Sequence, residues 1–210
     1  MAIVWPCSLS VDEYLAEGRD VEVPRPDCPG CAGAMSFWSG YERSVRCGGP
    51  CLRLWVRRAR CTLCRASHAL VPSFCLVGRL DVVEVIGEVV AAVVGEGEGV
   101  RPVAARLNVP HTTARDWVRR FARRSAMLAA GFAAVAVDMS GLAPVLGVDP
   151  AGRALATMAS AFAAVGARAG PGLPGLWPFA GLVTGGRLLA ANSDPLWFVI
   201  GKRRFIGPVP

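Results

Sequence analysis

Two pairs of cysteines, CPGC at residues 28–31 and CTLC at residues 61–64, decide the fold of the first third of this chain. A Cys-x-x-Cys turn places both thiolates on one side of a tight loop, called a knuckle. Two facing knuckles provide the tetrahedral four-sulfur cage that zinc prefers. We therefore predict one zinc ion, bound by Cys28, Cys31, Cys61 and Cys64. This zinc is expected to be structural, because the protein fills all four ligand positions.

The segment between the knuckles has the composition of a β-hairpin. MSFWSGYERSVRC (35–47) and CLRLWVRRARC (51–61) are rich in aromatic and β-branched residues, and a Gly-Gly-Pro turn separates them. We predict two antiparallel strands carried between the knuckles, in a small β zinc ribbon that spans residues 28–75. A unit of this size buries too little surface to fold without its metal.

The other thiols of this region leave three alternatives open. Cys47 and Cys51 flank the turn, where they are expected to bind a second metal with His68 or Cys75, to form a disulfide, or to remain free. For His68 itself, a surface or hydrogen-bonded position is favoured over metal ligation, because four cysteines already complete the main site.

The N-terminus gives no sign of export. It lacks a basic segment followed by a long apolar core, so no signal peptide is predicted, and clustered thiols then favour metal over disulfides. We expect a cytoplasmic, nucleoid-associated protein without a membrane span. Residues 1–27 are interpreted as a lead-in, with helical turns at 11–18 and an extended run at 21–26.

The second decisive stretch is GVRPVAARLNVPHTTARDWVRRFARR (99–124). Apolar residues recur at helical spacing on both sides of Asn108-Val109-Pro110, which is typical of two helices joined by a tight turn. We predict helices at 100–109 and 110–125, supported by a helix at 81–94. Together they make a helix-turn-helix domain over residues 81–125.

The outer face of the second helix carries the expected DNA contacts. A recognition helix reads bases with its N-terminal residues and meets phosphates further along. Base-edge contacts are therefore assigned to His111, Thr112, Thr113, Arg115 and Asp116. Phosphate contacts are assigned to Arg119, Arg120, Arg123 and Arg124. The alternative interpretation is an ordinary basic helix face that keeps the protein in solution.

Charge supports a polyanionic partner. The formal net charge of +7 is concentrated in residues 43–124, where fifteen arginines face six acidic residues, whereas residues 1–42 hold two arginines and seven acids. A concentrated positive surface attracts nucleic acid. We expect double-stranded DNA as the partner and no small-molecule substrate.

These motifs together resemble bacterial transposase-like proteins, in particular short members without a catalytic core. The resemblance covers residues 26–124, and TGGRLLAAN (184–192) is similar to the tails of those short proteins. It implies that the ribbon and the helix-turn-helix form a DNA-end-binding part. A homo-oligomer or a separate transposase subunit is a further expected partner.

Full-length transposases of this type cut DNA with three carboxylates that hold divalent metal. Here the chain after Phe121 contains only Asp138, Asp149 and Asp194, and two of these precede proline in turn signals. Asp138, in the context AVAVDMSG, is similar to a first catalytic aspartate at a strand end. We nevertheless expect no enzymatic activity. The alternatives are a truncated or split transposase and a zinc-ribbon adaptor that binds protein.

The last part, residues 126–210, is rich in Ala and Gly and is expected to be mostly helical, with helices at 126–137 and 151–169 and a break at 171–178. Residues 182–205 are expected to hold a helix and a strand. The predicted fold class is therefore α+β: a small β zinc ribbon, an all-α helix-turn-helix domain and a helical tail of unknown role.

Overall fold

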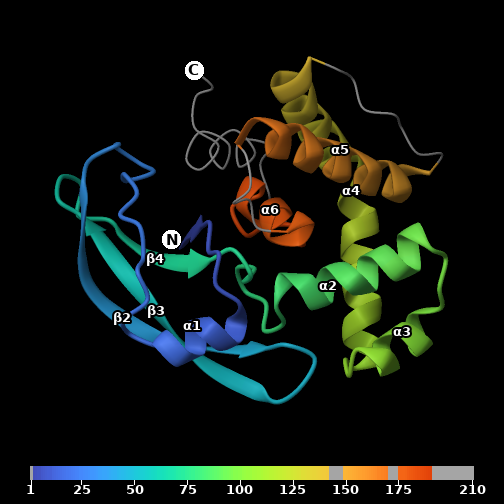
Figure 1. The fold of residues 1–210 in the computed structure, drawn as a ribbon, viewed down its shortest axis with the longest axis horizontal. Helices are drawn as coiled ribbons and strands as arrows, with labels where there is room; N and C mark the ends of the chain where they lie inside the picture. The colour runs from blue at the N-terminus through green and yellow to red at the C-terminus, as the bar shows by residue number, and fades with distance from the viewer. Residues whose placement is uncertain (1, 142–148, 170–174, 191–210) are drawn as a thin grey trace.

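The computed structural model describes residues 2–141, 149–169 and 175–190. A four-stranded sheet occupies one side of the molecule and a group of helices the other, as Figure 1 shows. The α+β fold class is confirmed, with the sheet and its cysteine cluster first and the helical region after it.

The sheet has the order β1-β4-β3-β2. Its strands are β1 (Ala2–Trp5), β2 (Met35–Arg46), β3 (Cys51–Cys61) and β4 (Ser67–Pro72). The predicted hairpin is confirmed, because β2 and β3 pair antiparallel from Met35↔Cys61 to Arg46↔Cys51. A β-bulge interrupts this register between Phe37 and Ser39.

The lead-in residues belong to the sheet, which the sequence interpretation did not foresee. β1 pairs in parallel with β4, so that Ile3 lies beside Leu70, and both side chains are buried. The expected helical turns are confirmed as α1 (Val11–Glu17), which begins with a capping box between Ser10 and Glu13. α1 lies against β3, where the Tyr14 hydroxyl donates a 2.9 Å hydrogen bond to a strand carbonyl.

The helices predicted as a helix-turn-helix lie beyond the sheet. Its supporting helix is α2 (Val83–Val90), which continues as one π-helical turn, η1 (Ala91–Gly95). α3 (Val100–Arg106) leads into the turn, where Asn108 has a φ of 52° and the Val109 N–H donates to the Ala104 carbonyl at 2.9 Å. α4 (His111–Ser140) follows immediately. The predicted helices and tight turn are therefore present.

α4 is longer than the sequence interpretation allowed. The segments expected as separate helices, 110–125 and 126–137, form one helix of 30 residues. The apolar spacing continues past residue 125 without a proline, so the helix continues with it. The buried positions in its second half include Leu128, Phe132, Val135 and Met139.

The tail packs on this helix. α5 (Pro150–Ala169) confirms the expected helix at 151–169 and lies along α4 (Figure 1). The break expected at 171–178 is partly wrong, because α6 (Leu176–Val183) includes Trp177 and Pro178. Proline is tolerated in the first turn of a helix, where its missing N–H has no intrahelical partner. The elements expected at 182–205 lie largely outside the described residues.

Candidate metal centre and nucleic-acid interface

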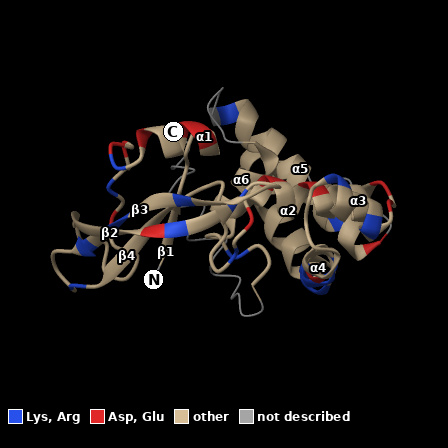
Figure 2. Cartoon of the chain, turned by 90° about the horizontal axis from the view of Figure 1, so that it is seen from below, with Lys and Arg blue, Asp and Glu red and all other residues tan. Residues whose placement is uncertain are grey.

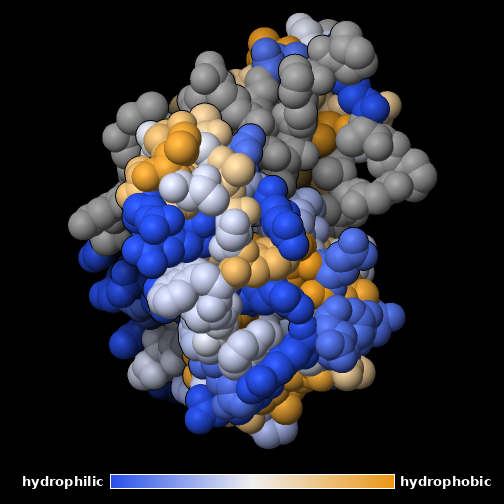
Figure 3. All heavy atoms as spheres, turned by 90° about the vertical axis from the view of Figure 1, so that its left-hand side faces the viewer, coloured by the Kyte–Doolittle hydropathy of each residue, from blue (hydrophilic) through white to orange (hydrophobic). Residues whose placement is uncertain are grey.

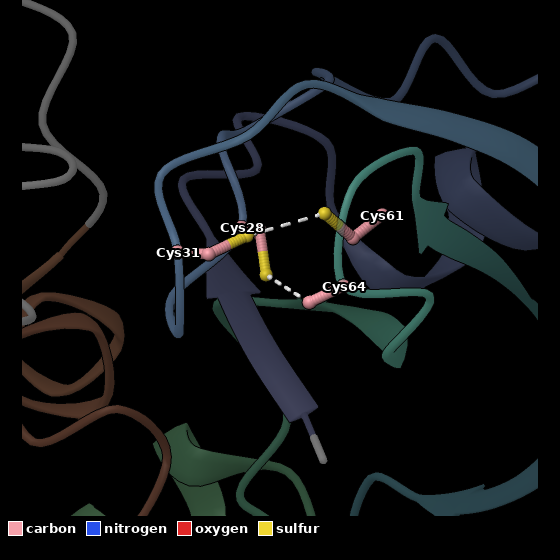
Figure 4. Close-up of side chains that lie close together, drawn as sticks. All are labelled: Cys28, Cys31, Cys61 and Cys64. Atoms are coloured by element: carbon pink, nitrogen blue, oxygen red, sulfur yellow. Dashed lines mark hydrogen bonds between the residues drawn. The ribbon is translucent and has the colours of Figure 1, made fainter.

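Four cysteine side chains converge at one end of the sheet. Cys28 and Cys31 come from the loop before β2, Cys61 ends β3, and Cys64 lies in the turn that follows. Their Sγ atoms all lie within 4.8 Å of one another, and Figure 4 shows the four side chains pointing toward a common centre. The closest pairs are Cys31–Cys61 at 3.4 Å and Cys28–Cys64 at 3.6 Å.

The two knuckles have the same local structure. In each, the first cysteine's backbone N–H donates to the carbonyl five residues later: Cys28 to Gly33 and Cys61 to Ala66, both at 2.9 Å. In each, the residue after the second cysteine adopts a positive φ, 57° at Ala32 and 63° at Arg65. Thr62 joins the knuckles, because its N–H and its hydroxyl both donate to the Ala34 carbonyl at 3.0 Å.

This arrangement fits a zinc ion. Four sulfurs on a tetrahedron with Zn–S bonds of about 2.3 Å lie about 3.8 Å apart. The observed contacts of 3.4 and 3.6 Å, and the outer limit of 4.8 Å, bracket this value. The cluster is therefore consistent with a zinc-binding site that holds one ion.

The cluster divides protons unequally among its thiols. Burial raises the pKa of Cys61, but backbone N–H groups of Cys64 and Leu63 and the neighbouring thiol of Cys31 outweigh it and bring the pKa to about 6. At Cys64 a backbone hydrogen bond from Ala66 lowers the pKa, but the surrounding thiols outweigh it and raise the pKa to about 12. A bound divalent cation would lower the pKa of all four thiols, because it favours the thiolate form of every ligand.

His68 lies against the cluster, a contact that the sequence did not reveal. The imidazole, in β4, is 1% exposed, and its Nε2 lies 3.8 Å from the Cys28 Sγ. The outer ligand sphere of a metal site usually contains such hydrogen-bonding groups, which orient the ligands. The histidine thus contacts a ligand rather than completing the set of four.

The remaining cysteines lie elsewhere. Cys47 and Cys51 are exposed at the tip of the β2–β3 hairpin, and Cys7 and Cys75 are buried. Within the described residues, no other group of three or more His, Cys, Asp or Glu side chains is placed to hold a metal. Burial raises the pKa of Cys75 to about 12, so its thiol is a poor metal ligand or nucleophile.

All the residues assigned to DNA contact lie along the first half of α4, and all but one of them are at least partly exposed. Thr112, Arg115, Arg119 and Arg123 are exposed, and His111, Thr113, Asp116 and Arg120 are partly exposed. Arg124 is buried, so in this structure its side chain does not lie on the exposed face where phosphate contact was expected. It lies seven residues after Trp117, on the inner stripe of the helix, and burial lowers its guanidinium pKa.

Asp116 organises two of these arginines. Its carboxylate accepts from Arg119 Nη2 at 2.6 Å and from Arg120 Nε at 2.5 Å. The Arg120 contact is the main cause of the lowered pKa of this carboxyl. Arg115 and Arg123 have no acidic partner among the ion pairs of the described residues.

The ribbon reaches the helix-turn-helix through its hairpin tip. A cleft of about 420 Å³ separates the hairpin residues Arg46 and Gly49 from the turn at 108–110. Gly48 lies close to the end of α3, because a Cβ there would come within 3.1 Å of the Leu107 carbonyl oxygen.

Figure 2 shows acidic residues at α1 and basic residues at α4, on different parts of the molecule.

Comparison of the chain with protein-family models, curated proteins and solved structures gives no match. Among the described helices, none has the length and apolar character needed to span a membrane.

Proposed function

We propose that this chain is a zinc-containing helix-turn-helix protein that binds duplex DNA. The observation that carries the proposal is the exposed row Arg115, Arg119 and Arg123, spaced four residues apart along α4 directly after the tight turn. Such a row presents cations along one helix face, at the position where a recognition helix enters the major groove. The sequence resemblance to the DNA-end-binding part of transposases agrees with this role.

The described carboxylates of the tail favour binding without cleavage. Asp138 lies within α4, so it does not follow a strand as a catalytic aspartate of a ribonuclease-H-like fold would. Asp149 precedes α5, where its Oδ1 accepts from the N–H groups of Ala151 and Gly152 at 2.9 Å and so caps the helix. Asp194 lies outside the described residues. Among the described residues neither aspartate follows a strand, so we do not propose a nuclease activity for the chain.

The test is selection of bound duplexes from a random DNA pool with zinc-loaded protein, followed by binding isotherms at several salt concentrations. Arg115→Ala is expected to relax preference at one or two base positions, because an Arg–guanine contact contributes about 1–3 kcal/mol of discrimination. Arg123→Ala is expected to weaken selected and scrambled duplexes alike and to lower the salt slope by about one.

Arg168→Ala provides a matched control, because this arginine is exposed in the last turn of α5 and leaves α4 unchanged. It is expected to bind like the unmodified protein. Equal effects of all three variants on both duplexes would refute an α4 interface. Nicking of a supercoiled plasmid in Mg²⁺ that Asp138→Ala abolishes would instead support the enzymatic alternative.

A further inference from the structure

A second cationic surface lies on the sheet, separate from α4. Between Met35 and Leu80 the sequence contains eight arginines and a single acidic residue, Glu42. Glu42 pairs with Trp55 across the hairpin, and the Trp55 ring lies under Arg19, on the face that α1 covers. The opposite face of the hairpin therefore carries arginine without a neighbouring carboxylate from its own strands.

Trp38 is the centre of this opposite face. It stands at the bulge of β2 and is 53% exposed, the largest exposed fraction of any described aromatic side chain. The guanidinium carbons of Arg58 and Arg60 lie 5.4 and 5.9 Å from its ring centroid. Its indole N–H donates to the Ser67 hydroxyl at 3.1 Å, so the edge of the ring is held by β4.

A second exposed ring shares the face. Tyr41 pairs with Val56 across the hairpin. Val56 lies two residues before Arg58 in β3, and residues two apart in a strand project from the same face, so the Tyr41 side chain is on the same side of the hairpin as Arg58. Tyr41 is 40% exposed. Figure 3 faces the end of the molecule that the strands form, and its surface there is mainly hydrophilic.

We propose that this face, defined by Trp38, Tyr41, Arg58 and Arg60, binds single-stranded nucleic acid. Every base has a π-face that stacks on an exposed aromatic ring, and arginines beside the ring neutralise the adjoining phosphates. The bases of a duplex offer only their edges in the grooves, so a ring held on a flat sheet cannot stack on them. An acidic peptide would use the arginines but would leave the two rings without a partner.

This surface is separate from the proposed duplex interface, and its proposal rests on the proposed function only in expecting a nucleic acid as the ligand. The two sites bind different ligands. Binding of a fluorescent oligonucleotide of about 12 thymidines reports on the sheet face, and the selected duplex reports on α4. An rU oligonucleotide of the same length distinguishes RNA from DNA as the natural strand.

The experiment compares Trp38→Ala, Trp38→Phe and Arg58→Ala in the zinc-loaded full chain. Trp38→Ala is expected to weaken dT binding about tenfold or more, and Trp38→Phe to restore most of that loss, because stacking needs a ring rather than an indole. Arg58→Ala should weaken binding and flatten its salt dependence. Duplex affinity should stay unchanged in all three, and zinc content should confirm that each variant is folded.

Three results would overturn the proposal: no binding of either oligonucleotide, equal affinity in Trp38→Ala and the unmodified protein, or equal losses for duplex and single strand. Loss of duplex binding in Arg115→Ala and Arg123→Ala with intact dT binding would leave it standing. If α4 fails to bind duplex while Trp38→Ala still abolishes dT binding, the proposed function fails and this inference survives.

Discussion

The guanidinium of Arg46, at the end of β2, and the carboxylate of Asp81, just before α2, form a two-contact ion pair. Nε lies 2.6 Å from Oδ1, and Nη2 lies 3.0 Å from Oδ2. The backbone reinforces the pair, because the Arg46 N–H and carbonyl bond to the residues on either side of Asp81. The last residue of the strand is thereby fixed to the first supporting helix of the helix-turn-helix.

Removal of this carboxylate should loosen the connection between sheet and helices. The Asp81 side chain is 4% exposed, so Asp81→Asn leaves a cation facing a neutral group in a largely dry contact. We expect a loss of about 1.5–3 kcal/mol in the free energy of unfolding, measured by urea titration. Glu98→Gln is the control, because it removes a similar two-contact pair with Arg106 that is exposed. A loss as large in the control would contradict a special role for Asp81.

The metal centre predicts a requirement for zinc in folding. Cys61→Ser removes a ligand whose Sγ lies 3.4 Å from that of Cys31, so the variant should lose zinc and the thermal transition of the sheet. Elemental analysis of the unmodified protein should give about one zinc per chain. Cys51→Ser changes an exposed thiol at the hairpin tip and should retain both metal and transition. Zinc retained by Cys61→Ser would show that the site is misassigned.

His68 should tune how tightly the metal is bound. Its Nε2 lies 3.8 Å from the Cys28 Sγ, where an N–H donor would stabilise a thiolate ligand. His68→Phe fills the buried space without a donor, and zinc affinity is expected to fall about tenfold. His68→Gln retains a donor and should bind zinc nearly as the unmodified protein does. Competition with a chromogenic chelator measures both, and identical affinities for the Phe and Gln variants would argue against the contact.

The β2–β3 hairpin and its four-cysteine cluster were predictable because their signals are local. The knuckles, the strands and the turn of the hairpin all lie within 28–64, and each has a composition that only a few structures satisfy. The two helices on either side of the tight turn at 108–110 were predictable for the same reason. β1 was not, because its partner β4 lies more than sixty residues away, and parallel pairing leaves no turn signal between them.

Other features could not be predicted because they depend on contacts between segments far apart in the sequence. Gly87 in α2 is covered by the Trp177 ring of α6, so closely that a Cβ would lie 2.0 Å from the indole. The Pro- and Gly-rich sequence around Trp177 gives no indication that this ring packs on Gly87. Arg124 was assigned to the DNA-facing surface because of its charge, although its spacing from Trp117 already placed it on the buried stripe. Periodicity was the better guide at that position, because burial follows the helix face.

Asp116 distinguishes two accounts of how α4 would contact the proposed DNA duplex. The sequence assigned it to base-edge contact, whereas the structure has its carboxylate bound to Arg119 and Arg120, with a pKa lowered mainly by the latter. If its role is to hold these arginines, Asp116→Asn removes one negative charge from the interface and frees both guanidinium groups.

Duplex affinity should then rise for selected and scrambled sites alike, with a salt slope steeper by about one, because the interface gains one unit of net positive charge. If Asp116 instead accepts a hydrogen bond from cytosine, Asn should weaken the selected site alone, by about 1–3 kcal/mol. Isotherms on both duplexes at several salt concentrations separate the two outcomes. We expect the uniform gain, because each carboxylate oxygen already accepts from a guanidinium group, and a cytosine contact would compete with those bonds.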